Sequence, residues 1–136
     1  MTLIFCIDEK GGLSFANRRQ SQDRALREYI MSNFVTDKII MSNYSYKQFS
    51  EYTNVIADDD FLINAAKGDV CFIEGYEIPV DKASKIILCN WNRHYPADKF
   101  FNTDLAAKGF DKISENRIKG YSHDEITIET YIRSLA

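Results

Sequence analysis

The segment from Leu3 to Ile7 constrains the fold more than any other, because it is apolar throughout and ends abruptly. Its length and character match a strand that is buried on both faces of a sheet. The next residues, DEKGG at 8–12, have the composition of a turn or loop. A strand of this kind needs a neighbour on each edge and a covering layer on each face. The sequence therefore predicts a sheet with this strand at its centre.

Further strands and helices alternate along the first two-thirds of the chain. We predict strands at residues 38–41, 54–57, 70–73 and 84–91, and a C-terminal antiparallel hairpin at 110–116 and 125–133. Helices are predicted after Ser21, after Ser42 and over 61–67, with a single helical turn at 76–81. The alternation favours an α/β fold of three layers, a mainly parallel sheet with helices on both faces.

Composition limits the protein to a few broad classes. The chain has 136 residues and a net charge of −3, which predicts one domain over residues 1–136 without a general affinity for nucleic acid. No apolar run approaches the ~18–20 residues that span a bilayer, and the N-terminus lacks the pattern of a signal peptide. We therefore expect a cytoplasmic protein without a membrane partner. Its oligomeric state is not determined by the sequence.

The thiols and histidines give weaker signals. Cys6, Cys71 and Cys89 each lie in an apolar run, which is typical of buried reduced thiols. His94 and His123 have no partner at the spacing of metal ligands, so we predict no metal site and place both histidines at the surface or in local hydrogen bonds. The acidic run at residues 58–60 is interpreted as a helix cap.

Several strings resemble dihydrofolate reductase, in the order in which they occur in that family. TLIFCIDEKGGLSF resembles its first strand and active-site loop, KIIMSNYSYKQF its second strand and helix, and DVCFIEGYEI the strand before its Gly-Gly turn. KIILCNWNRHYPADKFFN, FDKISE and ITIETYIR resemble the later strands. The resemblance implies a reduced version of that fold. A fainter resemblance is to small bacterial proteins sometimes labelled ribonuclease Z, whose zinc motif this chain lacks.

The family acts as an NADPH-dependent reductase of a pterin, so its residues can be compared with this chain. By local motif, the resemblance places Asp23 where the family has the carboxylate that holds and protonates the pterin; counting back from the strand at Ile39 places that position near Leu26. Asn43 and Ser45 stand at the positions that meet cofactor phosphates, and Glu74 and Gly75 at the Gly-Gly turn. A Glu74 side chain would obstruct a close approach of the pyrophosphate and its charge would repel it. We therefore expect that NADPH is not bound and that no cofactor is used.

A residual pocket is the sharpest prediction of a site. The resemblance and the helical spacing together place seven residues around it: Phe5, Cys6, Asp23, Leu26, Arg27, Ile73 and Cys89. Arg18, Arg19, Arg24 and Arg27 form a local basic cluster beside it, which could hold a phosphate or carboxylate.

Three functions are compatible with these observations. The first is a non-catalytic binding or interaction module, a pseudoenzyme that takes a small anionic ligand or a protein partner. The second is a divergent NADPH-dependent reductase of a pterin-like or pyrimidine-derived substrate, with Asp23 as the proton source. The third is a thiol-dependent enzyme or redox sensor that uses Cys6 or Cys89.

Overall fold

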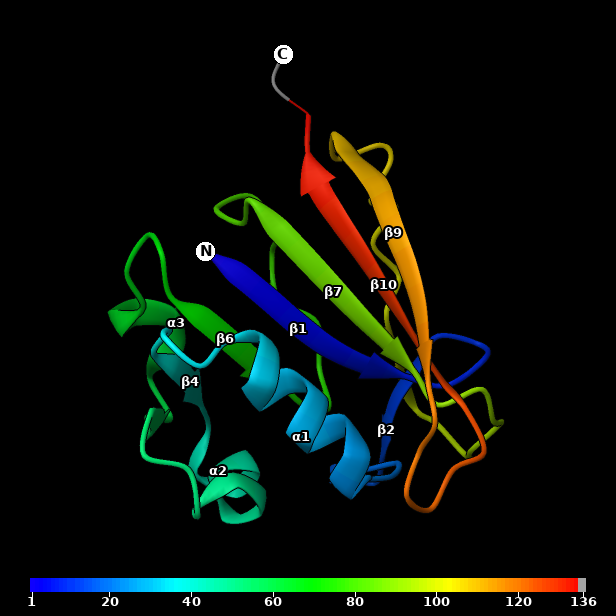
Figure 1. Cartoon of the computed structure of the whole chain (residues 1–136). Coiled ribbons are helices and arrows are strands. Elements are labelled where there is room, and N and C mark those ends of the chain that lie inside the picture. The colour runs from blue at the N-terminus through cyan, green and yellow to red at the C-terminus, as the bar shows by residue number, and fades with distance from the viewer. Residues whose placement is uncertain (135–136) are drawn as a thin grey trace.

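A seven-stranded sheet forms the centre of the molecule in the computed structural model, which describes residues 1–134 (Figure 1). The strand order is β5-β4-β6-β1-β7-β10-β9. The strands are β1 (Thr2–Ile7), β4 (Ile39–Met41), β5 (Val55–Ala57), β6 (Val70–Ile73), β7 (Lys85–Asn90), β9 (Phe110–Ile118) and β10 (Ile126–Arg133). The strands from β5 to β7 in this order pair in parallel, whereas β10 is antiparallel to β7 and to β9. The predicted α/β class, the central first strand and the closing hairpin are confirmed.

Strand β1 is buried on both faces because its alternate side chains enter two separate cores. Ile4 and Cys6 point to the face covered by α1 (Arg24–Asn33) and α2 (Asn43–Phe49). Leu3, Phe5 and Ile7 point to the opposite face. That second face is covered mainly by irregular segments and the short α3 (Phe61–Asn64), whose Phe61 enters the core. The prediction of helices on both faces was therefore only partly correct.

A second, three-stranded sheet, which was not predicted from the sequence, begins after the turn at residues 8–11. Its order is β3-β2-β8, formed by β2 (Gly12–Phe15), β3 (Arg18–Arg19) and β8 (Lys99–Phe100). The carboxylate of Asp8 organises its start, since it accepts hydrogen bonds from the backbone N–H groups of Lys10 and Gly12. A Cβ atom at Gly12 would lie 2.9 Å from an oxygen of Asp8, so only glycine fits there.

Three local predictions were wrong. Helix α1 is capped by Asp23 and not by Ser21. The helix predicted over 61–67 ends at Asn64, and its Leu62 is exposed. The segment 76–81 contains no helical turn. By contrast, the predicted cap of α2 is confirmed, because the Ser42 hydroxyl accepts a hydrogen bond from the N–H of Ser45.

The hairpin of β9 and β10 contains an irregularity on its outer strand. Thr130 pairs with Ser114 and Tyr131 with Lys112, so Ile113 is left without a partner on β10. Such a bulge twists an edge strand and interrupts its pairing surface. Among residues 1–134, no helix is long and apolar enough to cross a membrane.

Candidate functional site

A small cavity lies between the sheet and the N-terminal half of α1. It is lined by Cys6, Ser21, Gln22, Asp23, Leu26, Arg27, Ile30, Gln48, Phe49, Phe72, Glu74 and Trp91. The cavity has room for about one water molecule, because only about 10 Å³ is accessible to the centre of such a molecule. The interior is therefore too small for an organic ligand, and any larger ligand would have to sit at its mouth.

The structure brings only some of the predicted pocket residues together. Cys6, Asp23, Leu26 and Arg27 line this cavity. Phe5 and Ile73 belong to the core on the opposite face of the sheet, so their assignment to the pocket was wrong. The reason is the strand period of two, which turns each of them away from the face that carries Cys6 and Phe72. Cys89 is fully buried beside Cys6 on the neighbouring strand and does not line the cavity.

Asp23 directly precedes α1 and is the N-cap residue of that helix. One of its carboxylate oxygens accepts hydrogen bonds from the backbone N–H groups of Ala25, at 2.8 Å, and Leu26, at 3.4 Å. Its side chain is completely buried. An N-cap carboxylate is ordinarily solvated, so full burial requires further partners.

The loop between β9 and β10 supplies those partners. The backbone N–H groups of Tyr121 and Ser122 each donate to the Asp23 carboxylate at 2.9 Å, and that of His123 donates at 3.2 Å. A Cβ atom at Gly120 would lie 2.4 Å from the carbonyl oxygen of His123 and 2.9 Å from Asp23. Glycine at this position is therefore what lets the loop close over the carboxylate.

The electrostatics of Asp23 follow from these contacts. Burial by itself raises the pKa of its carboxyl group, but the N–H of Tyr121, the ring of His123 and the other backbone donors outweigh burial and hold the pKa well below its usual range. Asp23 is consequently an anion at every ordinary pH. It has no proton to give to a substrate.

His123 was predicted to lie at the surface or to make local hydrogen bonds, and the structure buries it in this site. It is only 4% exposed, and its Nδ1 atom lies 2.8 Å from Asp23 Oδ2. Its ring stacks on Trp91 with centroids 4.7 Å apart. Nε2 faces two hydroxyl groups, Ser21 Oγ at 2.9 Å and Tyr95 Oη at 3.0 Å. The surface location predicted for His123 is thus replaced by a buried position with a carboxylate on one side of the ring and two hydroxyl groups on the other.

Glu74 is the second carboxylate of the cavity, and it too has a partner within the chain. Arg19 of β3 donates to it through Nε at 3.0 Å and a terminal nitrogen at 3.2 Å. Gln48 donates at 2.8 Å, and the Glu74 side chain is 5% exposed. The guanidinium of Arg19 also lies over the ring of Tyr44, 4.1 Å from its centroid. The charge that was expected to repel phosphate is therefore neutralised by Arg19.

The other positions compared with cofactor-binding residues are also engaged locally. The backbone N–H and side-chain amide of Asn43 donate to the two carboxylate oxygens of Asp59, at 2.9 and 2.8 Å. Ser45 is buried and its hydroxyl bonds to that of Ser42. Gly75 has a φ of 93°, which favours glycine whatever approaches it.

The two neighbouring thiols of the core are poorly suited to nucleophilic chemistry. Cys6 and Cys89 pair across β1 and β7. A hydrogen bond between their side chains and burial raise the pKa of Cys6 well above its usual value. Burial also raises the pKa of Cys71 to about 11. All three cysteines are reduced and buried.

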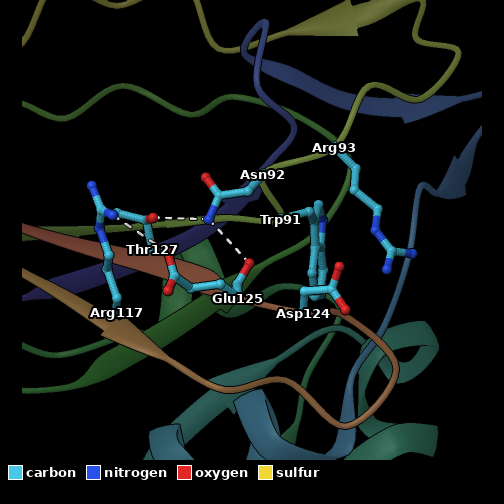
Figure 2. A pocket seen from close by; sticks show the side chains of 7 residues that line it. All are labelled: Trp91, Asn92, Arg93, Arg117, Asp124, Glu125 and Thr127. Atoms are coloured by element: carbon cyan, nitrogen blue, oxygen red, sulfur yellow. Dashed lines mark hydrogen bonds and ion pairs between the residues drawn. The ribbon is translucent and has the colours of Figure 1, made fainter.

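A larger, open pocket also borders Trp91. Its volume is about 300 Å³, and it is lined by Trp91, Asn92, Arg93, Arg117, Asp124, Glu125 and Thr127. Figure 2 shows the amide of Asn92 reaching the Glu125 backbone and the Thr127 hydroxyl. Arg117 forms an ion pair with Glu125 at 3.5 Å. This pocket was not predictable from local sequence patterns, because its residues come from three separate segments.

The strand order and the site together define the class of protein as a three-layer α/β fold. Its central strand β1 ends near the N-terminus of α1, where Asp23 supplies a buried carboxylate. No family model matches the sequence, and no curated protein matches it. A solved dihydrofolate reductase from Enterococcus faecalis, in complex with NADP(H) and RAB-propyl, matches with a TM-score of 0.66 at 13% identity. The match covers 98% of this chain and 96% of that chain. The chain therefore has a dihydrofolate reductase-like fold, and the likeness at this identity shows the fold alone.

Proposed function

We propose that this protein is a dihydrofolate reductase-like binding module without reductase activity. It binds a small anionic ligand at the mouth of the small cavity beside α1. One observation carries the proposal. Among the charged groups that line the cavity, Asp23 is bonded to His123 and Glu74 to Arg19, whereas Arg27 has no ion-pair partner within residues 1–134. A partly buried guanidinium without a carboxylate favours an anion from outside the chain.

The contacts of the former cofactor and substrate positions support the absence of reductase activity. The Arg19–Glu74 pair and the Asn43–Asp59 pair occupy donors that a dinucleotide phosphate would need. Asp23 is ionised and covered by the loop at 121–123, so it does not suit a proton donor for a pterin. These residues are a poor fit for NADPH.

Thermal unfolding with added ligands tests this proposal. We expect 1 mM NADPH to leave the melting temperature unchanged. Inorganic phosphate should raise it, by about 1.4 kcal/mol of stabilisation when the concentration is ten times the dissociation constant. Arg27→Gln should abolish the phosphate effect, and Arg18→Gln, which removes an exposed arginine of β3, should retain it. A rise with NADPH, or equal loss in both variants, would contradict the proposal.

A protein partner and a thiol-dependent enzyme have weaker support. A protein partner was predicted alongside the anionic ligand; near the site, Tyr121 is exposed but Trp91 is buried. The thiol-dependent enzyme requires an accessible thiolate, which burial and the raised pKa of Cys6 oppose. Location in the cytoplasm is part of the proposal.

Alkylation measures the thiol alternative directly. With iodoacetamide at pH 8, we expect the three cysteines of the folded protein to react far more slowly than in urea, because each is buried and the pKa of Cys71 is raised to about 11. Intact-mass measurements over time give the number of adducts. Fast modification of Cys6 or Cys89 in the folded protein would favour the thiol enzyme instead.

A further inference from the structure

Three side chains near the mouth of the cavity lie in a line that neither the fold nor the proposed binding function requires. Ser21 Oγ lies 2.9 Å from His123 Nε2, and His123 Nδ1 lies 2.8 Å from Asp23 Oδ2. Ser21 is partly exposed and lines the cavity, whereas Asp23 and His123 are buried behind it. The order from solvent inwards is hydroxyl, imidazole and carboxylate. This is the order in which a serine nucleophile, its base and the group that orients the base are arranged.

The protonation pattern follows from the hydrogen bonds. Asp23 accepts bonds from five backbone N–H groups, so it is held as a carboxylate and can only accept from the ring of His123. The proton of neutral imidazole is therefore assigned to Nδ1, and Nε2 presents its lone pair to the hydroxyl groups. Stacking on Trp91 keeps the ring in this plane. His123 is thus positioned to take the proton of Ser21.

Tyr95 is the competing partner of the imidazole. Its hydroxyl oxygen lies 3.0 Å from His123 Nε2 and 3.5 Å from Ser21 Oγ. Only one of the two hydroxyl groups can donate along the lone pair at a time. A phenol on this atom does not remove the serine, which stays within reach of the base.

We propose that Ser21 is a nucleophile that accepts the acyl group of small carboxylic esters, with His123 as its base and Asp23 as the residue that positions His123. In the first step the bond from Ser21 Oγ to the carbonyl carbon forms, and the hydroxyl proton moves to Nε2 of His123. The bond from the carbon to the alkoxy oxygen then breaks, and the leaving alcohol takes that proton. Water then attacks the acyl carbon and gives a proton to Nε2 of His123. The bond from the carbon to Ser21 Oγ breaks, Oγ takes that proton, and the carboxylic acid is released.

The surroundings of Ser21 suit a small acyl group. The cavity beneath it has space for about one water, so a long chain has no room inside. Gln22 follows directly, and its backbone N–H has no acceptor within residues 1–134, which leaves a donor for the oxygen that becomes negative. The inference does not rest on anion binding by Arg27, and either can fail without the other.

A fluorophosphonate probe tests the nucleophile. Reaction forms a bond from Ser21 Oγ to phosphorus and expels fluoride, which adds one label per chain to the intact mass. We expect peptide mapping to place the label on Ser21 and Ser21→Ala to abolish it. Ser32→Ala, which removes an exposed hydroxyl of α1 bonded only to its own helix, should label like the wild type. His123→Gln should slow labelling at least ~100-fold.

A second variant keeps the test decisive where His123→Gln fails to fold. The thiol introduced by Ser21→Cys should react with iodoacetamide at least ~10-fold faster at pH 7 than that of Ser32→Cys, because the imidazole takes its proton. We also expect the wild-type chain to hydrolyse 4-nitrophenyl acetate and Ser21→Ala to lose this activity. No label on folded protein, a label on Tyr95 or another serine, or equal rates for the two cysteine variants would overturn the inference.

Discussion

Replacing Asp23 with alanine should destabilise the protein by about 4 kcal/mol, a large part of the stability of a domain this size. The substitution leaves the buried N–H group of His123 and the partly buried N–H groups of Tyr121 and Ser122 without an acceptor. It also removes the cap of α1 and the acceptor of the His123 ring. Each unsatisfied buried donor costs about 1–3 kcal/mol, partly relieved by water entering the opened loop. Urea unfolding followed by circular dichroism measures the loss.

Asp60 provides the matched control, because it also occupies an N-cap position but its side chain makes no capping hydrogen bond. Asp60→Ala should change the free energy of unfolding by less than about 0.5 kcal/mol. If both variants lost the same stability, the effect would belong to helix capping or net charge and not to the contacts of Asp23.

The pH dependence of Asp23→Ala gives a second measurement. The carboxyl pKa of Asp23 is lower in the folded protein than in the unfolded chain, where it is about 4. Its contribution to stability is therefore fully present above pH about 5 and is lost as the pH falls toward the folded pKa. The difference in stability between wild type and Asp23→Ala should accordingly narrow below about pH 4. A constant difference from pH 7 to pH 2.5 would contradict this linkage.

Replacing Arg19 with methionine should destabilise the protein by about 2 kcal/mol, because it leaves the buried Glu74 carboxylate with Gln48 as its donor. Methionine keeps the apolar stem, so the loss reports on the charge. The expected loss of stability is smaller than the full cost of a buried charge without a partner, because the Arg19 side chain is 20% exposed and water can reach the space it leaves.

A double-mutant cycle with Glu74→Gln separates the ion pair from the packing of its members. Once Arg19 is replaced, removing the negative charge should restore about 1 kcal/mol, so the double variant should be more stable than Arg19→Met alone. Denaturant midpoints at unchanged slope give the four free energies. Additive losses from the two substitutions would mean that Arg19 and Glu74 do not depend on each other.

Much of the fold could be predicted from the sequence because its strands are apolar runs that the chain itself delimits. Residues 3–7 and 70–73 are of this kind, and they occupy the centre of the sheet. The small sheet of β2, β3 and β8 was missed because two of its strands have only two residues each. Such strands carry no periodic signal, and their pairing depends on contacts such as those of Asp8.

The site was harder to predict because its contacts join distant parts of the chain. Asp23 and His123 are 100 residues apart in sequence, and Arg19 and Glu74 are 55 apart. Local patterns reveal neither pair. The residue that could have indicated the burial of His123 was Gly120, because glycine at this position lets the loop approach Asp23. A single glycine after a strand is also typical of an ordinary hairpin turn, so it does not indicate a buried histidine by itself.

The central position of β1 has a consequence for the order in which the protein can assemble during synthesis. β1 is synthesised before its partners β6 and β7, where Thr2 pairs with Val70 and Lys85. This apolar segment therefore remains without its partner strands until β6 has been translated. In a nascent chain that stalls before β6 emerges, both edges of β1 are unpaired. We therefore expect a chaperone that binds extended apolar segments to bind this strand.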